Sequence, residues 1–506
     1  MDVLKQLLEE IKSGKIKTKK ELARQKRQLS HGKKQIPDNS AILALAKGKL
    51  RENVRKLLQI KPTRTISGVA VVAVMSKPAP CPHGKCTYCP HIENVPESYT
   101  GKEPATRRGI ANKFDPYKQV QNRLQQLYAT GHLPEKVELI IMGGTFPSQP
   151  EDYQEEFVRD CILAMNLFPA DKPKIAPKLE ETQHANEHAK IRCVGMTFET
   201  RPDFAKEKHA DFMLGLGGTR VELGVQTISD EIYKKVNRGH TVADVISATK
   251  ILKDKGFKIL FHMMLGLPGS NPEKDIKAFE EIFANPDFRP DMLKIYPCLV
   301  IKGSEIYNDW KAGKYQPYDE KTAIEIIKAV KMLCPEWIRI MRIERDIPGT
   351  EIAAGIKSTN LRQLLGKTDC QCIRCREVGH RAAKGILLEK KSVKLSKIYY
   401  NASGGEEIFL QFKDKNQTLV GFLRLRLNNT DTAIIRELHV YGEQIPIGKK
   451  GKIQHIGFGK KLLKEAEKIA TAAGKKKISV ISGIGVREYY KKLGYKFDGT
   501  YMSKLI

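Results

Sequence analysis

Short apolar runs alternate with helix-like segments through the middle of the chain. The apolar runs predict buried strands at Val69–Val74, Val137–Met142, Ile191–Thr197, Arg220–Val225, Lys258–Met264 and Met292–Pro297. Between them, apolar residues recur at helical spacing in segments such as Asp115–Thr130 and Thr241–Lys255. Strands that alternate with helices indicate a parallel sheet, so we expect a full or partial α/β barrel over residues 64–348. Side chains that carry chemistry are expected at the carboxyl ends of its strands.

The pattern changes after a connecting segment at residues 349–391. Three strand patterns then precede a glycine-rich turn and a helix, and a further strand and a short helix follow. In order, these elements are Glu407–Phe412, Val420–Leu427, Ala433–Tyr441, Lys460–Ala473, Ile478–Ile481 and Arg487–Leu493. Residues 392–506 are therefore predicted to form a separate α+β domain.

The first 63 residues form a distinct basic segment, with 17 Lys and Arg against 6 Asp and Glu. Apolar residues recur at helical spacing from Leu4 to Ile11, and a second helix is predicted from Ser40 to about Leu57. Ordinary surface helices also carry solvated charge, but an excess of +11 in this short segment favours nucleic acid as a partner. We therefore predict a helical nucleic-acid-binding module at residues 1–63.

The composition of the whole chain agrees with several soluble domains. Its 506 residues are 41% hydrophobic and 29% charged, and that length is too great for one hydrophobic core. The 88 Lys and Arg against 58 Asp and Glu give a formal charge of +30, which suits a polyanion or an anionic membrane surface and excludes an acidic solvating protein. We read no signal sequence and no apolar run of about 18 residues, so we expect a cytoplasmic protein without a membrane partner.

Cys81, Cys86 and Cys89 have the spacing C-x4-C-x2-C in a loop after the first predicted strand. Three thiolates at this spacing can hold three irons of a [4Fe–4S] cluster and leave the fourth iron open. The motif resembles that of the radical S-adenosylmethionine (SAM) enzymes, whose usual spacing is one residue shorter. This resemblance implies that SAM binds the open iron. The alternative is a structural zinc with a distant fourth ligand.

Two further segments support the resemblance to radical SAM enzymes. Gly143 and Gly144 follow the predicted strand that ends at Met142, where that family approaches the SAM amino group with backbone. Glu222 and Gln226 lie at the end of a later strand, as in the same family. The resemblance thus implies that these two pairs of residues contribute to the SAM site.

Gln454, Gly457 and Gly459 form the pattern Q-x-x-G-x-G before the predicted helix Lys460–Ala473. Glycines at a helix N-terminus let backbone N–H groups approach a pyrophosphate. The pattern resembles the acetyl-CoA site of the GNAT acetyltransferases, in which a tyrosine of the closing helix lies near the thioester sulfur. This implies that Tyr490 is the acid or positioning residue, and core packing is the alternative for Tyr490 and its neighbour Tyr489.

Cys370, Cys372 and Cys375 place three thiols within six residues of the connecting segment. Thiolate sets at this spacing suit tetrahedral zinc, so we predict a zinc site that joins the two domains. His380 or Cys334 could supply the fourth ligand, and reduced free cysteines are the alternative.

A radical SAM domain followed by a GNAT domain resembles the catalytic subunits of Elongator, in their archaeal and bacterial single-subunit form. The motifs at 98–104, 142–146, 436–441 and 481–487 extend this resemblance over nearly the whole chain. It implies that the N-terminal module binds the anticodon stem-loop of tRNA. It also implies a reaction in which SAM radical chemistry and acetyl-CoA place a carboxymethyl-type group on C5 of the wobble uridine, position 34.

The same resemblance implies further site residues and partners. The implied acetyl-CoA contacts are Lys136, Glu437, Leu438, His439, Val440, Phe458, Gly459, Lys460 and Tyr490. An electron-donor protein is expected because the cluster must be reduced. A homodimer remains open as an alternative to a monomer.

Two other functions are compatible with parts of the sequence. A protein lysine acetyltransferase with a structural iron–sulfur cluster would acetylate a peptide without SAM or reductant. A tRNA-binding subunit with decayed enzymatic sites is disfavoured because the cysteine, glycine and tyrosine motifs are complete. The +30 charge also argues against a basic, histone-like substrate.

Overall fold

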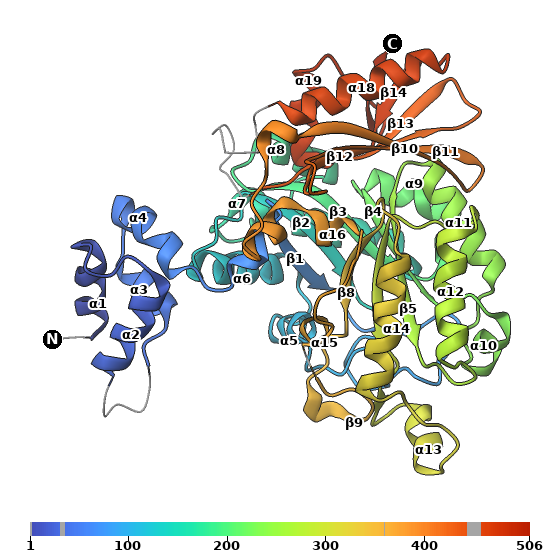
Figure 1. The fold of residues 1–506 in the computed structure, drawn as a ribbon, viewed down its shortest axis with the longest axis horizontal. Helices are drawn as coiled ribbons and strands as arrows, with labels where there is room; N and C mark the ends of the chain where they lie inside the picture. Colours follow the sequence, from blue (N-terminus) through green and yellow to red (C-terminus); the bar gives the residue numbers. More distant parts are fainter. Residues whose placement is uncertain (1–2, 31–35, 359, 443–456) are drawn as a thin grey trace.

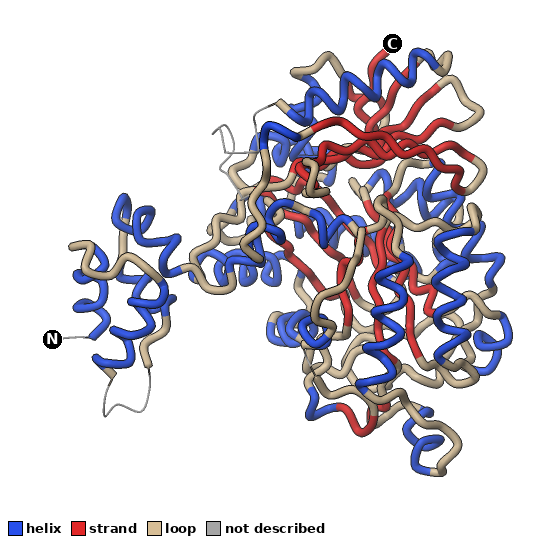
Figure 2. The backbone as a smooth tube through the Cα atoms, in the orientation of Figure 1, coloured by secondary structure: helices blue, strands red, loops and turns tan. Residues whose placement is uncertain are grey.

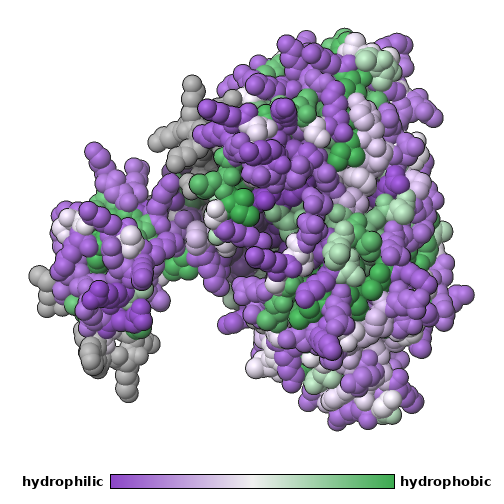
Figure 3. Space-filling model, in the orientation of Figure 1, coloured by the Kyte–Doolittle hydropathy of each residue, from purple (hydrophilic) through white to green (hydrophobic). Residues whose placement is uncertain are grey.

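The computed structural model describes residues 3–30, 36–358, 360–442 and 457–506. A group of N-terminal helices, a barrel of strands and helices, and a C-terminal sheet domain follow one another along the chain (Figure 1). The N-terminal helices stand to one side, whereas the C-terminal sheet lies against the barrel (Figure 2). The face drawn in Figure 3 is largely hydrophilic on all three parts. In the described part of the chain, no helix has the length and apolar character needed to cross a membrane.

The N-terminal module packs four described helices around a small core of its own. The helices are α1 (Val3–Lys12), α2 (Lys19–Leu29), α3 (Asn39–Leu45) and α4 (Gly48–Leu58). Leu7, Ile42 and Leu58 are buried between them. The prediction of one continuous helix from Ser40 to Leu57 is wrong, because the chain leaves the helix after Leu45 and restarts at Gly48, whose φ is +52°.

A parallel sheet forms the centre of the molecule, as the alternating pattern predicts. Its strands are β1 (Ala70–Met75), β2 (Lys136–Met142), β3 (Arg192–Thr200), β4 (Arg220–Gln226), β5 (Lys258–Leu265), β6 (Met292–Pro297) and β8 (Arg339–Ile343), paired in that order. Among the described pairings β1 and β8 do not join, so the barrel is partial. The last of these strands, β8, was not predicted.

Helices cover the outer face of this sheet. They are α5 (Pro104–Ala111), α6 (Pro116–Ala129), α7 (Glu151–Leu167), α8 (Leu179–His188), α9 (Glu207–Gly215), α11 (Val242–Asp254), α12 (Pro272–Ala284) and α14 (Glu320–Leu333). The short helices α10 (Asp230–Lys235) and α13 (Glu305–Lys311) instead pack beside the cysteine loop. Strand residues such as Val72, Leu139, Phe198 and Phe261 join the apolar core. Because side chains alternate across a strand, the intervening residues face the inside of the barrel.

Short elements connect the barrel to the C-terminal domain. They are β9 (Ile352–Ala354), α15 (Leu361–Leu364), α16 (Ile373–Arg376) and α17 (Val378–Ala383). The short strand β7 (Val300–Ile301) comes earlier, between β6 and α13, and pairs with β9. Single turns of 3-10 helix occur at η1 (Pro62–Thr65), η2 (Phe146–Ser148), η3 (Pro202–Phe204), η4 (Gly349–Glu351), η5 (Lys390–Ser392) and η6 (Ile484–Val486).

The C-terminal domain is a twisted mixed sheet with one long helix on it. The strands are β10 (Lys394–Ala402), β11 (Gly405–Lys413), β12 (Leu419–Leu427), β13 (Thr432–Val440), β14 (Lys477–Val480), β15 (Lys496–Asp498) and β16 (Tyr501–Leu505), and the helices are α18 (Phe458–Ala472) and α19 (Arg487–Lys491). The strand pair β13–β14 is parallel and ends at Ile435 and Val480, although β13 continues to Val440. The two strands therefore diverge and leave a gap.

Buried ion pairs and close backbone contacts join the two large domains. Arg436, on β13, lies 2.6 Å from Asp291 Oδ1 of the barrel and 2.9 Å from Glu407 of its own sheet, and all three side chains are almost fully buried. The turn at η6 lies directly on β3, since a Cβ on Gly483 would be 2.1 Å from the carbonyl oxygen of Val194. Only glycine permits this approach.

Candidate active site

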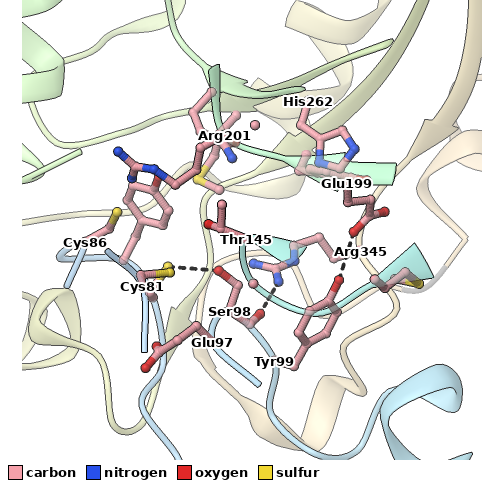
Figure 4. A pocket seen from close by; sticks show the side chains of 18 of the residues that line it. Cys81, Cys86, Glu97, Ser98, Tyr99, Thr145, Glu199, Arg201, His262 and Arg345 are labelled. Carbon is pink, nitrogen blue, oxygen red and sulfur yellow. Dashed lines mark hydrogen bonds between the residues drawn. The ribbon is translucent and has the colours of Figure 1, made fainter. Parts of the chain in front are cut away.

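The cysteine loop closes one end of a pocket at the carboxyl ends of the barrel strands. The pocket has a volume of about 150 Å³ and is lined by Cys81, Cys86 and Cys89 together with residues from β2 to β8. Figure 4 shows the two labelled cysteines on one side of the pocket and Glu199 and His262 on the other. The predicted iron ligands are therefore brought together at the predicted end of the sheet.

The surroundings of Cys86 favour its thiolate form. Its Sγ lies 3.0 Å from His83 Nε2 and 3.6 Å from Arg238 Nη1. A hydrogen bond from the Cys89 thiol lowers the pKa of Cys86, and His83 and the Arg238 charge lower it further against the opposing effect of burial. Burial raises the pKa of the Cys81 thiol, and the hydrogen bond to Cys86, together with burial, raises that of Cys89. Cys86 is thus held in the form that binds iron, and the grouping of the three thiols in one pocket fits a metal cluster.

Most of the predicted SAM residues reach the same pocket. Gly144, Glu222 and Gln226 line it, whereas Gly143 lies behind it against Ser76. A Cβ on Gly143 would be 2.3 Å from Ser76 Oγ, so this position needs glycine. Within the described residues, the buried side-chain oxygens of Thr145 and Gln226 have no hydrogen-bond partner. Unpaired polar atoms in a pocket fit a polar ligand such as SAM.

Charged and polar side chains of the inner barrel wall also line this pocket. Glu222 is fully buried and contacts Lys294, with His262 Nε2 at 2.8 Å and Arg220 Nη2 at 3.3 Å. Burial opposes ionisation of this carboxyl, but Lys294, His262 and Arg220 hold its pKa well below the usual range. Arg220, His262 and Lys294 were not predicted as site residues, although each is a polar residue at an inward position of a predicted apolar strand.

A second pocket of about 540 Å³ lies where the β13–β14 gap meets the start of α18. Most of the predicted acetyl-CoA residues line it, namely Lys136, Leu438, His439, Val440, Gly457, Phe458, Gly459, Lys460 and Tyr490. Glu437 lines the adjoining interdomain pocket instead, and Gln454 lies outside the described residues. Burial lowers the pKa of Lys136 and of His439.

Both tyrosines of α19 reach this second pocket. Tyr490 is buried in the domain core and also lines the pocket, so packing and pocket roles do not exclude each other here. Tyr489 packs on the same core, and burial raises its pKa to about 12. Sequence reasoning favoured Tyr490 alone, because the exposure of two adjacent residues on a short helix cannot be read from spacing.

An interdomain pocket of about 260 Å³ continues from the second pocket to the amino-terminal end of the barrel. The two pockets share Ser67, Val69, His439 and Tyr490. Barrel residues Glu138, Arg220, Lys258 and Arg339 line its far side. Arg220 contacts Glu222, which lines the cysteine pocket, so one layer of side chains separates the two chambers on this strand.

The second cysteine group is compact. The Sγ atoms of Cys370, Cys372 and Cys375 all lie within 4.8 Å of one another, a spacing that fits one small metal ion. Lys331 Nζ lies 3.5 Å from Cys375 Sγ. His380 instead contacts Glu377 at 3.3 Å, and Cys334 directs its thiol to the carbonyl of Pro335.

The sequence matches four protein-family models along its length. They are an ELP3 N-terminal domain at residues 1–66, the radical SAM superfamily at 78–282, a radical SAM C-terminal domain at 290–368 and the GNAT acetyltransferase family at 384–495. The first three follow the helical module and the barrel, and the last follows the C-terminal sheet.

Relatives cover almost the whole chain. The tRNA uridine(34) acetyltransferase of Methanocaldococcus jannaschii is 52% identical over 93% of this chain and 90% of its own. Elongator complex protein 3 of Saccharomyces cerevisiae is 42% identical over 94% of this chain and 89% of its own. The solved structure of an N-terminally deleted Elp3 from Methanocaldococcus infernus is 49% identical, with a TM-score of 0.77, over 87% of this chain and all of its own. The chain therefore belongs to the family of tRNA uridine(34) acetyltransferases and Elongator complex protein 3, which combines a radical SAM domain with a GNAT domain.

Proposed function

We propose that this chain is a radical SAM-dependent acyltransferase that places a carboxymethyl-type group on C5 of uridine 34 in tRNA. One observation carries the proposal: the thiol-lined pocket reaches Glu222, and the interdomain pocket, which shares residues with the pocket of the GNAT domain, reaches Arg220, and these two side chains are in contact on β4. Uracil C5 is too weak a nucleophile to attack a thioester, so the acetyl donor needs a second source of reactivity. The names of the archaeal relatives support uridine 34 as the target.

In this proposal Cys81, Cys86 and Cys89 hold a [4Fe–4S] cluster, and Gly144, Glu222 and Gln226 line the SAM site, with Gly143 supporting it from behind. When bound, the cluster and SAM supply the one-electron chemistry that activates a carbon–hydrogen bond. The unpaired oxygen of Gln226 is suited to accept a hydrogen bond from an amino group. The charge of Glu222 is held by its cations, so it orients polar partners without taking up a proton.

The proposed acetyl-CoA site uses the end of α18. Gly457, with a φ of +102°, turns the chain into this helix, whose first N–H groups and positive dipole end suit a pyrophosphate. Lys136 and Lys460 add positive charge from the barrel and from the helix. Tyr490 lies where this pocket joins the interdomain pocket, and burial raises its pKa, which keeps the hydroxyl protonated and able to orient the thioester.

Further partners belong to the same proposal. The N-terminal module would bind the tRNA anticodon stem-loop, a protein would donate electrons, and Cys370, Cys372 and Cys375 would hold zinc. The domain boundaries 1–63, 64–348, 349–391 and 392–506 remain our proposal. None of the ten cysteines, each within the described residues, forms a disulfide, which favours a reducing compartment such as the cytoplasm. A homodimer would be distinguished from a monomer by sedimentation equilibrium.

The decisive experiment assays the modified nucleoside. The anaerobically reconstituted, reduced protein is incubated with SAM, acetyl-CoA and tRNA, and the digested RNA is analysed by mass spectrometry. We expect 5-carboxymethyluridine that depends on both cosubstrates. Failure to form it with a spectroscopically intact cluster would refute the proposal, and acetylation of a peptide without SAM or reductant would instead support the lysine acetyltransferase.

A further inference from the structure

The turn that follows helix α10 holds the cysteine loop along its length. Thr87 N donates to the carbonyl of Val236 at 3.1 Å, and Asn237 Nδ2 donates to the carbonyl of Lys85 at 2.6 Å. Gly239, at a φ of +74°, packs on the ring of His83 so closely that a Cβ would lie 2.7 Å from that side chain. Residues 236–240 therefore contact the cysteine loop between Cys81 and Cys89. The spacing between the first two cysteines of this loop is one residue longer than is usual in this superfamily.

Arg238 is the centre of this turn and points at the cysteine pocket. Its side chain is 7% exposed, and Nη1 lies 3.6 Å from Cys86 Sγ. Nη2 donates to the carbonyl of Gly224 at 2.5 Å, which fixes the plane of the guanidinium. In the described ranges, no carboxylate forms an ion pair with Arg238.

A buried guanidinium without a carboxylate needs another source of negative charge. The Cys86 sulfur, 3.6 Å from Nη1, is the ligand atom within reach of the Arg238 charge. Arginine keeps its proton in proteins, so this charge is present at every working pH. A metal cluster on the three thiolates would carry more negative charge than Cys86 alone.

We propose that Arg238 is a positioning residue that sets the reduction potential of the cluster by holding a permanent positive charge beside the Cys86 sulfur. The proposal rests on the proposed function, because it requires a cluster on the cysteine loop. Reduction adds one electron, delivered by the donor protein, and makes no bond. A nearby positive charge and a hydrogen bond to a ligand sulfur both favour the reduced state, so Arg238 makes the cluster easier to reduce.

The test is a redox titration of the reconstituted full-length protein, followed by electron paramagnetic resonance of the reduced cluster. Arg238→Met removes the charge, and Arg238→Gln removes it while keeping a donor. For both variants we expect the equilibrium constant for reduction of the cluster to fall at least tenfold. For a one-electron step this is a shift of the midpoint potential by about 59 mV to more negative values. Arg238→Lys, which keeps the charge, is expected to recover most of the wild-type value.

Lys234→Met is the matched control, because it removes an exposed positive charge from α10. Solvent screens this charge, so the midpoint potential of the cluster should not change measurably. A neutral Arg238 variant with full iron content and the wild-type midpoint would overturn the proposal. Both neutral variants could instead lose their iron. In that case an Arg238→Lys protein that binds iron and has the wild-type midpoint potential supports the role of the charge, and an Arg238→Lys protein that binds no iron overturns the proposal. A wild-type chain that binds no iron would refute the proposed function itself, independently of any variant.

Discussion

Arg220 and Glu222 lie two residues apart on β4, and Nη2 of the first is 3.3 Å from Oε1 of the second, yet they line different pockets. On β6, Met292 and Lys294 repeat this two-residue spacing, since the first lines the interdomain pocket and the second the cysteine pocket; on β5 the corresponding residues, Lys258 and His262, are four residues apart. Two residues of strand correspond to about 7 Å. On β4 and β6 the interdomain pocket and the cysteine pocket are therefore separated by about 7 Å along the strand.

Removing Arg220 should destabilise this layer. Arg220→Met leaves Glu138 without its arginine and weakens the cation set around Glu222, so we expect a loss of about 3 kcal/mol in the free energy of unfolding. Arg220→Met with Glu138→Gln should recover part of it, since the second change removes the unpaired charge. Urea unfolding of both variants measures the difference. Lys277→Met, which breaks an exposed pair with Glu273, is the control and should change nothing measurable.

Cys86→Ser should abolish carboxymethyluridine formation while leaving tRNA affinity within about twofold, because the thiolate serves the cluster and not the RNA. Iron content and the nucleoside assay report the first effect, and filter binding reports the second. Cys161→Ala removes a buried thiol from α7, outside the motif, and should keep its iron. Full product from Cys86→Ser would contradict the ligand assignment.

Buried Lys253 should make the protein more stable as the pH rises above 8. It is fully buried, 4.0 Å from Asp291 and 3.9 Å from Glu407, and burial lowers its pKa to about 8 against 10.5 for the free side chain. The charged form costs free energy below pH 8, and this cost disappears as the pH rises to about 10.5. Relative to Lys253→Met, the wild-type protein should gain about 3 kcal/mol over that range. Urea unfolding of both proteins at a series of pH values tests this. If the free energy of unfolding changes equally with pH in the wild type and in Lys253→Met, the prediction is contradicted.

The basic face of α2 should contribute to RNA binding. Lys20, Arg24 and Arg27 are exposed at helical spacing on one side of the helix. Changing all three to Gln should weaken tRNA binding and reduce the slope of log affinity against log salt by about one per lost phosphate contact. A matched variant with Glu9→Gln, on α1, should not reduce the slope. An unchanged slope in the triple variant would place the RNA elsewhere.

Tyr490→Phe separates orientation from packing. The ring stays in the core and only the hydroxyl is lost, so we expect the rate of product formation to fall at least tenfold with acetyl-CoA affinity within about twofold. Tyr489→Phe provides the comparison from the same helix. If Tyr489→Phe shows the loss and Tyr490→Phe does not, the assignment within the pair is reversed.

The sequence predicts the barrel well because its strands are apolar on one face and are separated by long helices. Strand β8 escapes prediction since Arg339 and Arg342 interrupt its apolar pattern, and those arginines are inward residues of the barrel. Strand β10 escapes for a related reason: as an edge strand, it leaves side chains such as Tyr399 exposed and has no continuous buried face.

The site is predicted in part. Motifs that use close spacing, such as the cysteine loop and the glycines before α18, are visible in the sequence because their residues are neighbours. The inner charges are not, because Arg220, His262 and Lys294 are contributed by different strands and meet only when the sheet curls. Arg238 is of the same kind, since it lies 152 residues from Cys86 along the chain.

The ion pairs of Arg436 with Asp291 and Glu407 constrain how this enzyme can be inherited and engineered. An excised C-terminal domain would keep Arg436 but lose Asp291, and a domain taken from another protein would have to supply the matching charge. Exchange of one domain between related proteins is therefore expected to destabilise the fold unless the residues on both sides of this domain interface are exchanged together. The barrel and the C-terminal domain should therefore be inherited as one unit, and engineered chimaeras should not place their junction between these two domains.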